Sequence, residues 1–357
     1  MLNSKLEGNG PSAILMNRDA ISRSEAAVGW LAPVDRLRCQ VLKALGPMAR
    51  VLVRRRELRV AVAGCGVLMV SLVGVLGAPF WLLALGPVVL GVPHLVADLR
   101  YLVVRPGLHR RRGLWLPVGG PLLLAAVGWH SMAAGLVACA AMALLARGPM
   151  ARKGVAVLAT GAVAAGVVVT GPAASLIFAH LHNVIAVVLW WLWRPRTTLW
   201  PWLMPSIFSV LSLLLLVGAL EPWARGLAWQ PAGLGPDHQL SFLAPGVPDP
   251  WALRLVLLFA FAQSVHYGVW LRLIPEDDRT RPTPRTFQAT ARALRSEFGW
   301  PALTVAVVLA AGIALWATFD LVAARENYLR MALFHGYLEL VALVWLFIER
   351  PQRAAGP

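Results

Sequence analysis

Stretches of about twenty apolar residues, with loops rich in arginine between alternate pairs of them, recur between residues 58 and 348 of this chain. Hydrophobic residues fill 58% of its 357 positions, charged residues fill only 14%, and the mean hydropathy is +0.66. A stretch of this length crosses a bilayer as a helix, because a helix bonds its own backbone polar groups in lipid. The sequence therefore predicts an all-α fold, a polytopic bundle of transmembrane helices.

About ten spans are predicted within a transmembrane helical domain that covers residues 58–349. They lie near residues 58–77, 81–104, 114–129, 131–147, 155–171, 173–193, 201–220, 251–274, 301–320 and 329–348. The third and fourth are short and rich in glycine, so one re-entrant hairpin is the alternative for that pair. Residues 1–57 are expected to form a cytoplasmic tail with an interfacial amphipathic helix over 34–57, and residues 350–357 a second tail.

The arginines occupy alternate loops, which predicts the orientation of the chain. The predicted inner loops hold Arg105, Arg110–Arg112, Arg147, Arg152, Arg194, Arg196, Arg279, Arg281, Arg285, Arg292 and Arg295, and the outer side keeps only Arg225, Arg254, Arg325 and Arg330. By the positive-inside rule both termini are cytoplasmic. The net charge of +16 then follows from membrane topology. We expect a lipid bilayer of the bacterial inner or plasma membrane type, and no nucleic-acid partner.

Ionisable side chains lie inside four predicted spans, and all four spans run from the outer to the inner side. They are His94 with Asp98, His180 with His182, His266, and His335 with Glu339. An ionisable residue at membrane depth is costly and indicates a functional site. Parallel helices bring similar positions to similar depth, so the histidines are expected to meet near the bilayer midplane.

Two of these groups pair a histidine with a carboxylate four residues later, which places both side chains on one helix face. For His94 with Asp98, and for His335 with Glu339, the functional interpretation is a metal ligand with a second ligand or with an orienting carboxylate. The alternative is a hydrogen bond that joins neighbouring helices.

His180 and His182 point about 200° apart on a regular helix, so one is expected to reach a shared centre while the spacing favours neither. Gln263 shares a helix face with His266, and Tyr267 adds a hydroxyl group. Imidazole and carboxylate groups without clustered thiolates favour a transition metal with nitrogen and oxygen ligands. Non-haem iron is expected first, with haem or copper as alternatives. The apolar setting favours a lipophilic small-molecule substrate.

Short motifs in this chain resemble those of the Brp/Blh-type β-carotene 15,15′-dioxygenases. They are Pro93-His94 with Asp98, His266-Tyr267-Gly268, and His335-Gly336 with Glu339. The chain departs from that family in the order of the motifs, and it has His180-x-His182 where the family has a His-x-x-x-His pair. The resemblance implies a helical membrane bundle that holds a non-haem iron on His94, His266, His335 and either His180 or His182.

Three functions are consistent with this pattern. The first is a membrane non-haem iron oxygenase or dioxygenase that oxidises or cleaves an isoprenoid, a carotenoid or another lipid. In it Asp98 and Glu339 complete or orient the ligand shell, while Gln263 or Tyr267 positions dioxygen or substrate. The second is a haem protein that transfers electrons or modifies haem. The third is a proton-coupled transporter in which His94, Asp98 and Glu339 relay protons.

Overall fold

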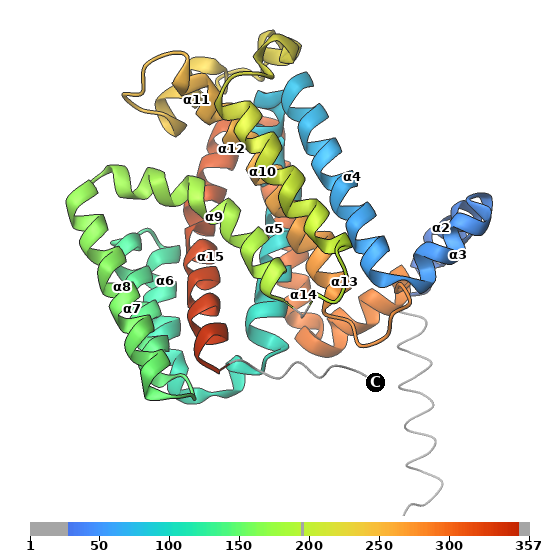
Figure 1. Cartoon of the computed structure of the whole chain (residues 1–357), viewed down its shortest axis with the longest axis horizontal. Coiled ribbons are helices and arrows are strands. Elements are labelled where there is room, and N and C mark those ends of the chain that lie inside the picture. Colours follow the sequence, from blue (N-terminus) through green and yellow to red (C-terminus); the bar gives the residue numbers. More distant parts are fainter. Residues whose placement is uncertain (1–27, 194–195, 350–357) are drawn as a thin grey trace, which may run out of the picture. The chain divides into compact units, whose positions relative to one another are not determined.

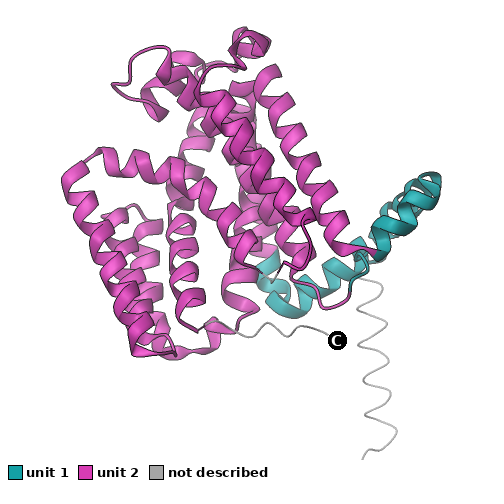
Figure 2. Cartoon of the chain, viewed as in Figure 1, with its two compact units in different colours: residues 1–54, 282–303 teal, residues 55–281, 304–357 magenta. Residues whose placement is uncertain are grey.

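A computed structural model describes residues 28–193 and 196–349, which fold mainly into helices joined by turns and loops and contain no strand (Figure 1). The predicted tail segments 1–27 and 350–357 lie outside them. The chain divides into two compact units (Figure 2). One unit comprises residues 1–54 with 282–303, and the other comprises residues 55–281 with 304–357. The predicted all-α fold is confirmed.

Within the described residues, seven helices are long and apolar enough to cross a membrane, which is consistent with an α-helical membrane bundle. They are Arg56–Gly77 (α4), Pro79–Val104 (α5, Pro79–Asp98, with η2, Leu99–Val104), Met150–Thr170 (α8), Ala173–Leu192 (α9), Trp251–Asp277 (α12, Trp251–Gly268, with η9, Val269–Leu273, and α13, Ile274–Asp277), Phe287–Phe319 (α14) and Leu321–Glu349 (α15). Each overlaps one of the predicted spans, although α14 and α15 start well before the predicted residues 301 and 329.

The remaining three predicted spans form helices shorter than the twenty or so residues that a full crossing needs. Residues 114–129 give Trp115–Gly119 (η5) and Gly120–Ala126 (α6), residues 131–147 give Ser131–Leu145 (α7), and residues 201–220 give Trp200–Trp202 (η6) and Leu203–Leu216 (α10). The other elements are Gly29–Leu31 (η1), Ala32–Ala44 (α2), Gly46–Arg54 (α3), Leu108–Arg110 (η3), Arg112–Leu114 (η4), Glu221–Trp223 (η7), Arg225–Ala228 (η8) and Pro236–Leu243 (α11).

The smaller unit contains the segment predicted as one interfacial helix. It forms two helices, α2 and α3, because Gly46, the first residue of α3, has a φ of +57°, outside the helical range. The Asp35 carboxylate accepts hydrogen bonds from the backbone N–H groups of Phe287 (2.8 Å) and Gln288 (3.1 Å), which caps the start of α14. Gly299, with a φ of +76°, interrupts α14 before its membrane portion.

Four helices of the larger unit surround one central region. Helix α5 packs against α12 and α15, and α9 packs against the same two helices, so that the four close a ring. The approach of α15 to α5 depends on Gly91, where an added Cβ would lie 2.4 Å from the Tyr328 ring. Each of the four helices carries one of the sequence-predicted groups of ionisable residues.

A run of acidic residues at the end of the α12 segment joins several helices through ion pairs. The buried Glu276 carboxylate lies 2.5 Å from Arg59 of α4, 3.1 Å from Arg272 and 3.6 Å from Arg279. The next residue, Asp277, lies 2.8 Å from Arg196. Of these arginines, Arg196 and Arg279 belong to predicted inner loops, whereas Arg59 and Arg272 lie near the ends of predicted spans.

Replacing Glu276 with glutamine is expected to lower the free energy of unfolding by about 3–5 kcal/mol, because it removes a buried negative charge that lies among three guanidinium groups. Unfolding of the purified protein in detergent measures this. The control is Glu221→Gln, since Glu221 pairs with Arg254 in a more exposed position and is expected to contribute about 1 kcal/mol or less. Equal effects of the two substitutions would contradict the expectation.

Candidate metal centre

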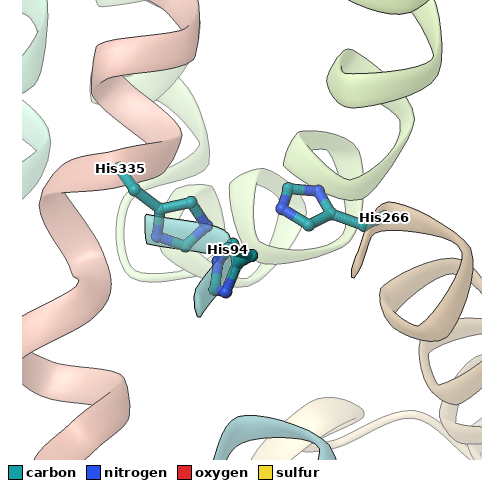
Figure 3. A group of neighbouring side chains, drawn as sticks. All are labelled: His94, His266 and His335. Carbon is teal, nitrogen blue, oxygen red and sulfur yellow. The ribbon is translucent and has the colours of Figure 1, made fainter. Parts of the chain in front are cut away.

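Three imidazole rings from three helices face one point inside the larger unit. His94 of α5, His266 of α12 and His335 of α15 each offer a ring nitrogen, and these nitrogens all lie within 4.8 Å of one another (Figure 3). His94 and His266 are each only 1% exposed. The rings are 4.9–5.6 Å apart between centroids and meet edge to face.

Hydrogen bonds to backbone carbonyls orient two of these rings. Nδ1 of His94 donates to the carbonyl oxygen of Leu90 at 3.2 Å, and Nδ1 of His335 donates to that of Ala332. A carbonyl only accepts, so Nδ1 carries the proton, and Nε2 of a neutral ring presents a lone pair. Both Nε2 atoms are buried and have no hydrogen-bond partner among the described residues. Metal-bound histidines are commonly held by such a bond on the second nitrogen.

His182 of α9 is the fourth ring of this group. Its centroid lies 5.3 Å from those of both His266 and His335, and its Nδ1 donates to the carbonyl of Ala179 at 2.8 Å. His180 turns away, and its Nε2 lies 3.0 Å from the carbonyl oxygen of Leu243. The structure therefore separates two candidates that the sequence spacing left open: His182 adjoins the centre, and His180 contacts the backbone at the last residue of α11.

The carboxylate beside the cluster belongs to Glu339. Its Oε1 accepts a hydrogen bond from Trp270 Nε1 at 2.6 Å and lies 3.7 Å from His266 Nε2, while its Oε2 is buried without a partner among the described residues. Glu339 thus faces a histidine on another helix rather than His335, its expected partner on α15. A fully buried carboxylate next to imidazole nitrogens provides an oxygen ligand or a nearby negative charge for a cation.

Asp98 lies one helical turn beyond His94 and is fully buried. Neither of its oxygens has a hydrogen-bond partner among the residues that the structure describes. The His94 ring instead uses the carbonyl of Leu90, because side chains on a helix lean toward its N-terminus and reach the preceding turn. Asp98 is therefore a buried acid close to the cluster and does not orient His94.

A cavity of about 580 Å³ opens beside the four histidines, all of which contribute to its wall. Most of its lining is apolar and includes Phe178 and Phe259. Gln263 and Tyr267 also line it, and the Tyr267 ring centroid lies 4.7 Å from that of His94. Such a cavity fits a lipophilic molecule and holds a few polar groups near the imidazoles.

Three residues of this site were missed from the sequence. Helix α15 starts at Leu321, where Asp320 Oδ1 accepts a hydrogen bond from Ala323 N at 2.9 Å, eight residues before the predicted start of the span at residue 329. Arg325 and Tyr328 therefore lie inside the helix and on the cavity wall, not in an outer loop. The spacing of 325, 328, 332, 335 and 339 along one helix face was the available signal. No sequence signal indicated that Trp270, the hydrogen-bond partner of Glu339, belongs to the site.

Both helices that carry His94 and His266 change to π-helical geometry just beyond the site. The π-helical turn η2 begins at Leu99, and η9 begins at Val269. Such turns are rare and recur at functional sites, because the wider turn alters the direction of the side chains around it. Here they follow two of the three converging histidines.

The donor set fits a transition metal. Two imidazole nitrogens bound to one ion at about 2.1 Å are at most about 4.2 Å apart, so small ring rotations bring the three nitrogens within reach. Nitrogen donors with one carboxylate suit iron, copper or zinc better than magnesium or calcium.

Compared with protein-family models, with curated proteins and with solved structures, the chain matches none of them.

Proposed function

We propose that this chain is an integral-membrane, metal-dependent oxidoreductase that oxidises or cleaves a lipophilic substrate with dioxygen. The observation that carries the proposal is the convergence of His94, His266 and His335 on one buried point in the wall of an apolar cavity. The short motifs that resemble the carotenoid dioxygenases supply these same three histidines. A carotenoid, another isoprenoid or a lipid chain is the proposed substrate class.

Non-haem iron is the proposed cofactor, held by the three histidines together with His182 or Glu339. Iron with free coordination positions supplies the one-electron chemistry that dioxygen requires to react with a hydrocarbon chain. The chain's own residues prepare that chemistry. The hydrogen bonds of His94 and His335 hold Nε2 toward the shared point, and the Glu339 charge offsets that of a cation.

The cavity beside the histidines is the proposed binding site for the substrate. Its apolar lining excludes water and holds a hydrocarbon chain beside the imidazoles, while Gln263 and Tyr267 offer the polar groups that would position it or dioxygen. The amide of Gln263 both donates and accepts hydrogen bonds, whereas the Tyr267 hydroxyl carries one proton. These two residues are positioned to act on substrate without binding the metal.

A haem protein is the second candidate, and the geometry disfavours it. A haem takes two axial ligands from opposite sides of a flat macrocycle. His94, His266 and His335 instead lie within 4.8 Å of one another, and His182 adjoins two of them, which leaves no plane for a porphyrin between the rings. Absorption spectra separate the two candidates, because only haem gives a Soret band.

Metal analysis of the purified protein, with its absorption spectrum, tests the proposal. We expect about one equivalent of iron per chain, or of copper in its place, and no Soret band. A Soret band would replace the proposal with the haem candidate. Less than about half an equivalent of any transition metal, even after incubation with ferrous iron, would overturn it. Proton-coupled uptake in vesicles would then become the function to test.

A further inference from the structure

A buried arginine lies in the same cavity wall as the histidines, and no described residue gives it an acidic partner. Arg325 is 1% exposed, and no carboxylate of the described residues lies within ion-pair distance of it. Its Nε donates to the carbonyl of Leu83 at 2.8 Å, and its Nη2 lies 3.3 Å from Gln239 Oε1. Nη1 has no partner among the described residues. A buried charge left in this state is costly unless an anion joins it.

A second donor without a partner among the described residues lies about one helical turn from this arginine on α15. Tyr328 is 2% exposed, and its hydroxyl has no hydrogen-bond partner within the described part of the chain. Arg325, Tyr328 and His335 all line the cavity and follow one another at intervals of three and seven residues, which places them on one helix face. Ten residues of helix separate Arg325 from His335, a rise of roughly 15 Å.

Arg325 and Tyr328 thus form the polar end of a cavity that is otherwise mainly apolar. The ring of Phe242, on α11, lies 5.6 Å from the Arg325 guanidinium carbon and also lines the cavity. A guanidinium with a neighbouring phenol is suited to an oxyanion, because its planar donors match carboxylate or phosphate oxygens. A hydrocarbon without a head group would leave both donors unpaired.

We infer that this cavity binds an amphiphile with an oxyanion head group, a carboxylate or a phosphate, on a long apolar chain. Arg325 and Tyr328 bind the head group, and the chain extends along α15 toward the four histidines. The binding of the amphiphile does not depend on the proposed function, whereas the statement about which carbon is oxidised does. Under that function, the rise of roughly 15 Å places the oxidised carbon far along the chain from the head group.

Binding measured on the purified full-length protein in detergent tests this inference. The probes are a long-chain carboxylate, its methyl ester and the phosphate monoester of the same chain, compared at pH 8, where a carboxylate is ionised. We expect at least one anion to bind about tenfold more tightly than the ester, and whichever binds better identifies the head group. Equal binding of all three probes by the wild-type protein would overturn the inference.

Variants of α15 assign the preference to its residues. Arg325→Gln is expected to reduce the tenfold preference to about twofold or less. Arg330→Gln changes an exposed arginine on the same helix and is expected to leave it unchanged. Tyr328→Phe removes only the unpaired hydroxyl. It is expected to weaken anion binding about threefold without changing ester binding. This variant provides the test if Arg325→Gln does not fold. A full preference retained in folded Arg325→Gln would contradict the assignment.

Treatment of the wild-type protein with a chelator separates this inference from the proposed function. The anion preference is expected to persist in chelated protein, because Arg325 and Tyr328 bind the head group without a metal. A protein that never contains metal yet prefers the anion would refute the oxidoreductase and leave the binding site standing. A protein that contains metal but binds acid and ester equally would refute the anion-binding site and leave the proposed oxidoreductase standing.

Discussion

Alanine at His266 is expected to remove the metal from the purified protein, leaving less than about one tenth of the wild-type content. His266 is 1% exposed, and neither ring nitrogen has a hydrogen-bond partner among the described residues. Both ring nitrogens are therefore available to a metal ion, and the Glu339 carboxylate lies 3.7 Å from Nε2. His94→Ala and His335→Ala are expected to give the same loss, because each removes one of the three converging nitrogens.

His180→Ala is the matched control for these substitutions. His180 lies two residues from His182 on α9, but its Nε2 contacts the carbonyl of Leu243. This variant is expected to keep its full metal content, whereas His182→Ala is expected to bind metal more weakly than wild type. Elemental analysis of all five purified variants provides the comparison. Undiminished metal in the His94, His266 and His335 variants would refute the proposed centre.

Glutamine at Glu339 is expected to weaken metal binding by about 10–100-fold. The substitution keeps the size of the side chain, and the amide oxygen still accepts the hydrogen bond that Trp270 Nε1 now donates to Oε1. What it removes is the negative charge 3.7 Å from His266 Nε2. The loss of affinity therefore measures electrostatic stabilisation of a cation rather than a change in packing.

Competition with a chelator of known affinity measures that change. The control is Glu349→Gln, ten residues further along α15, where the carboxylate pairs with Arg111 at 2.5 Å. We expect this control to leave metal affinity within about twofold of wild type, because the pair lies nearly three helical turns beyond Glu339. Equal affinities of Glu339→Gln and the wild type would show that the Glu339 charge plays no part in binding.

Much of the fold follows from hydropathy, and the differences have local causes. Long apolar runs predicted the seven long helices, because backbone hydrogen bonding in lipid leaves few alternatives. The run at 114–129 contains Pro117 and Pro121, and it folds into a π-helical turn and a short helix. Helix α15 starts early because Asp320 caps it, a signal that hydropathy averages hide.

The candidate site was predicted in its main residues but not in its contacts. The sequence indicated that His94, His266 and His335 would meet, because their predicted spans run in the same direction. The depth of each histidine follows from its position along its span. The pairing of Glu339 with Trp270 and His266 depends on how α15 faces α12, which spacing on one helix does not define. Arg325 was assigned to a loop because its charge outweighed the helical spacing around it.

X-ray absorption at the edge of the bound metal tests the central claim most directly. The account predicts three or four imidazole ligands, nitrogen or oxygen neighbours at about 2.0–2.2 Å, and no sulfur neighbour. The loss of one imidazole from the spectrum of any His→Ala variant that retains metal would agree with this. A metal surrounded by sulfur, by a porphyrin or by fewer than two imidazoles would contradict it.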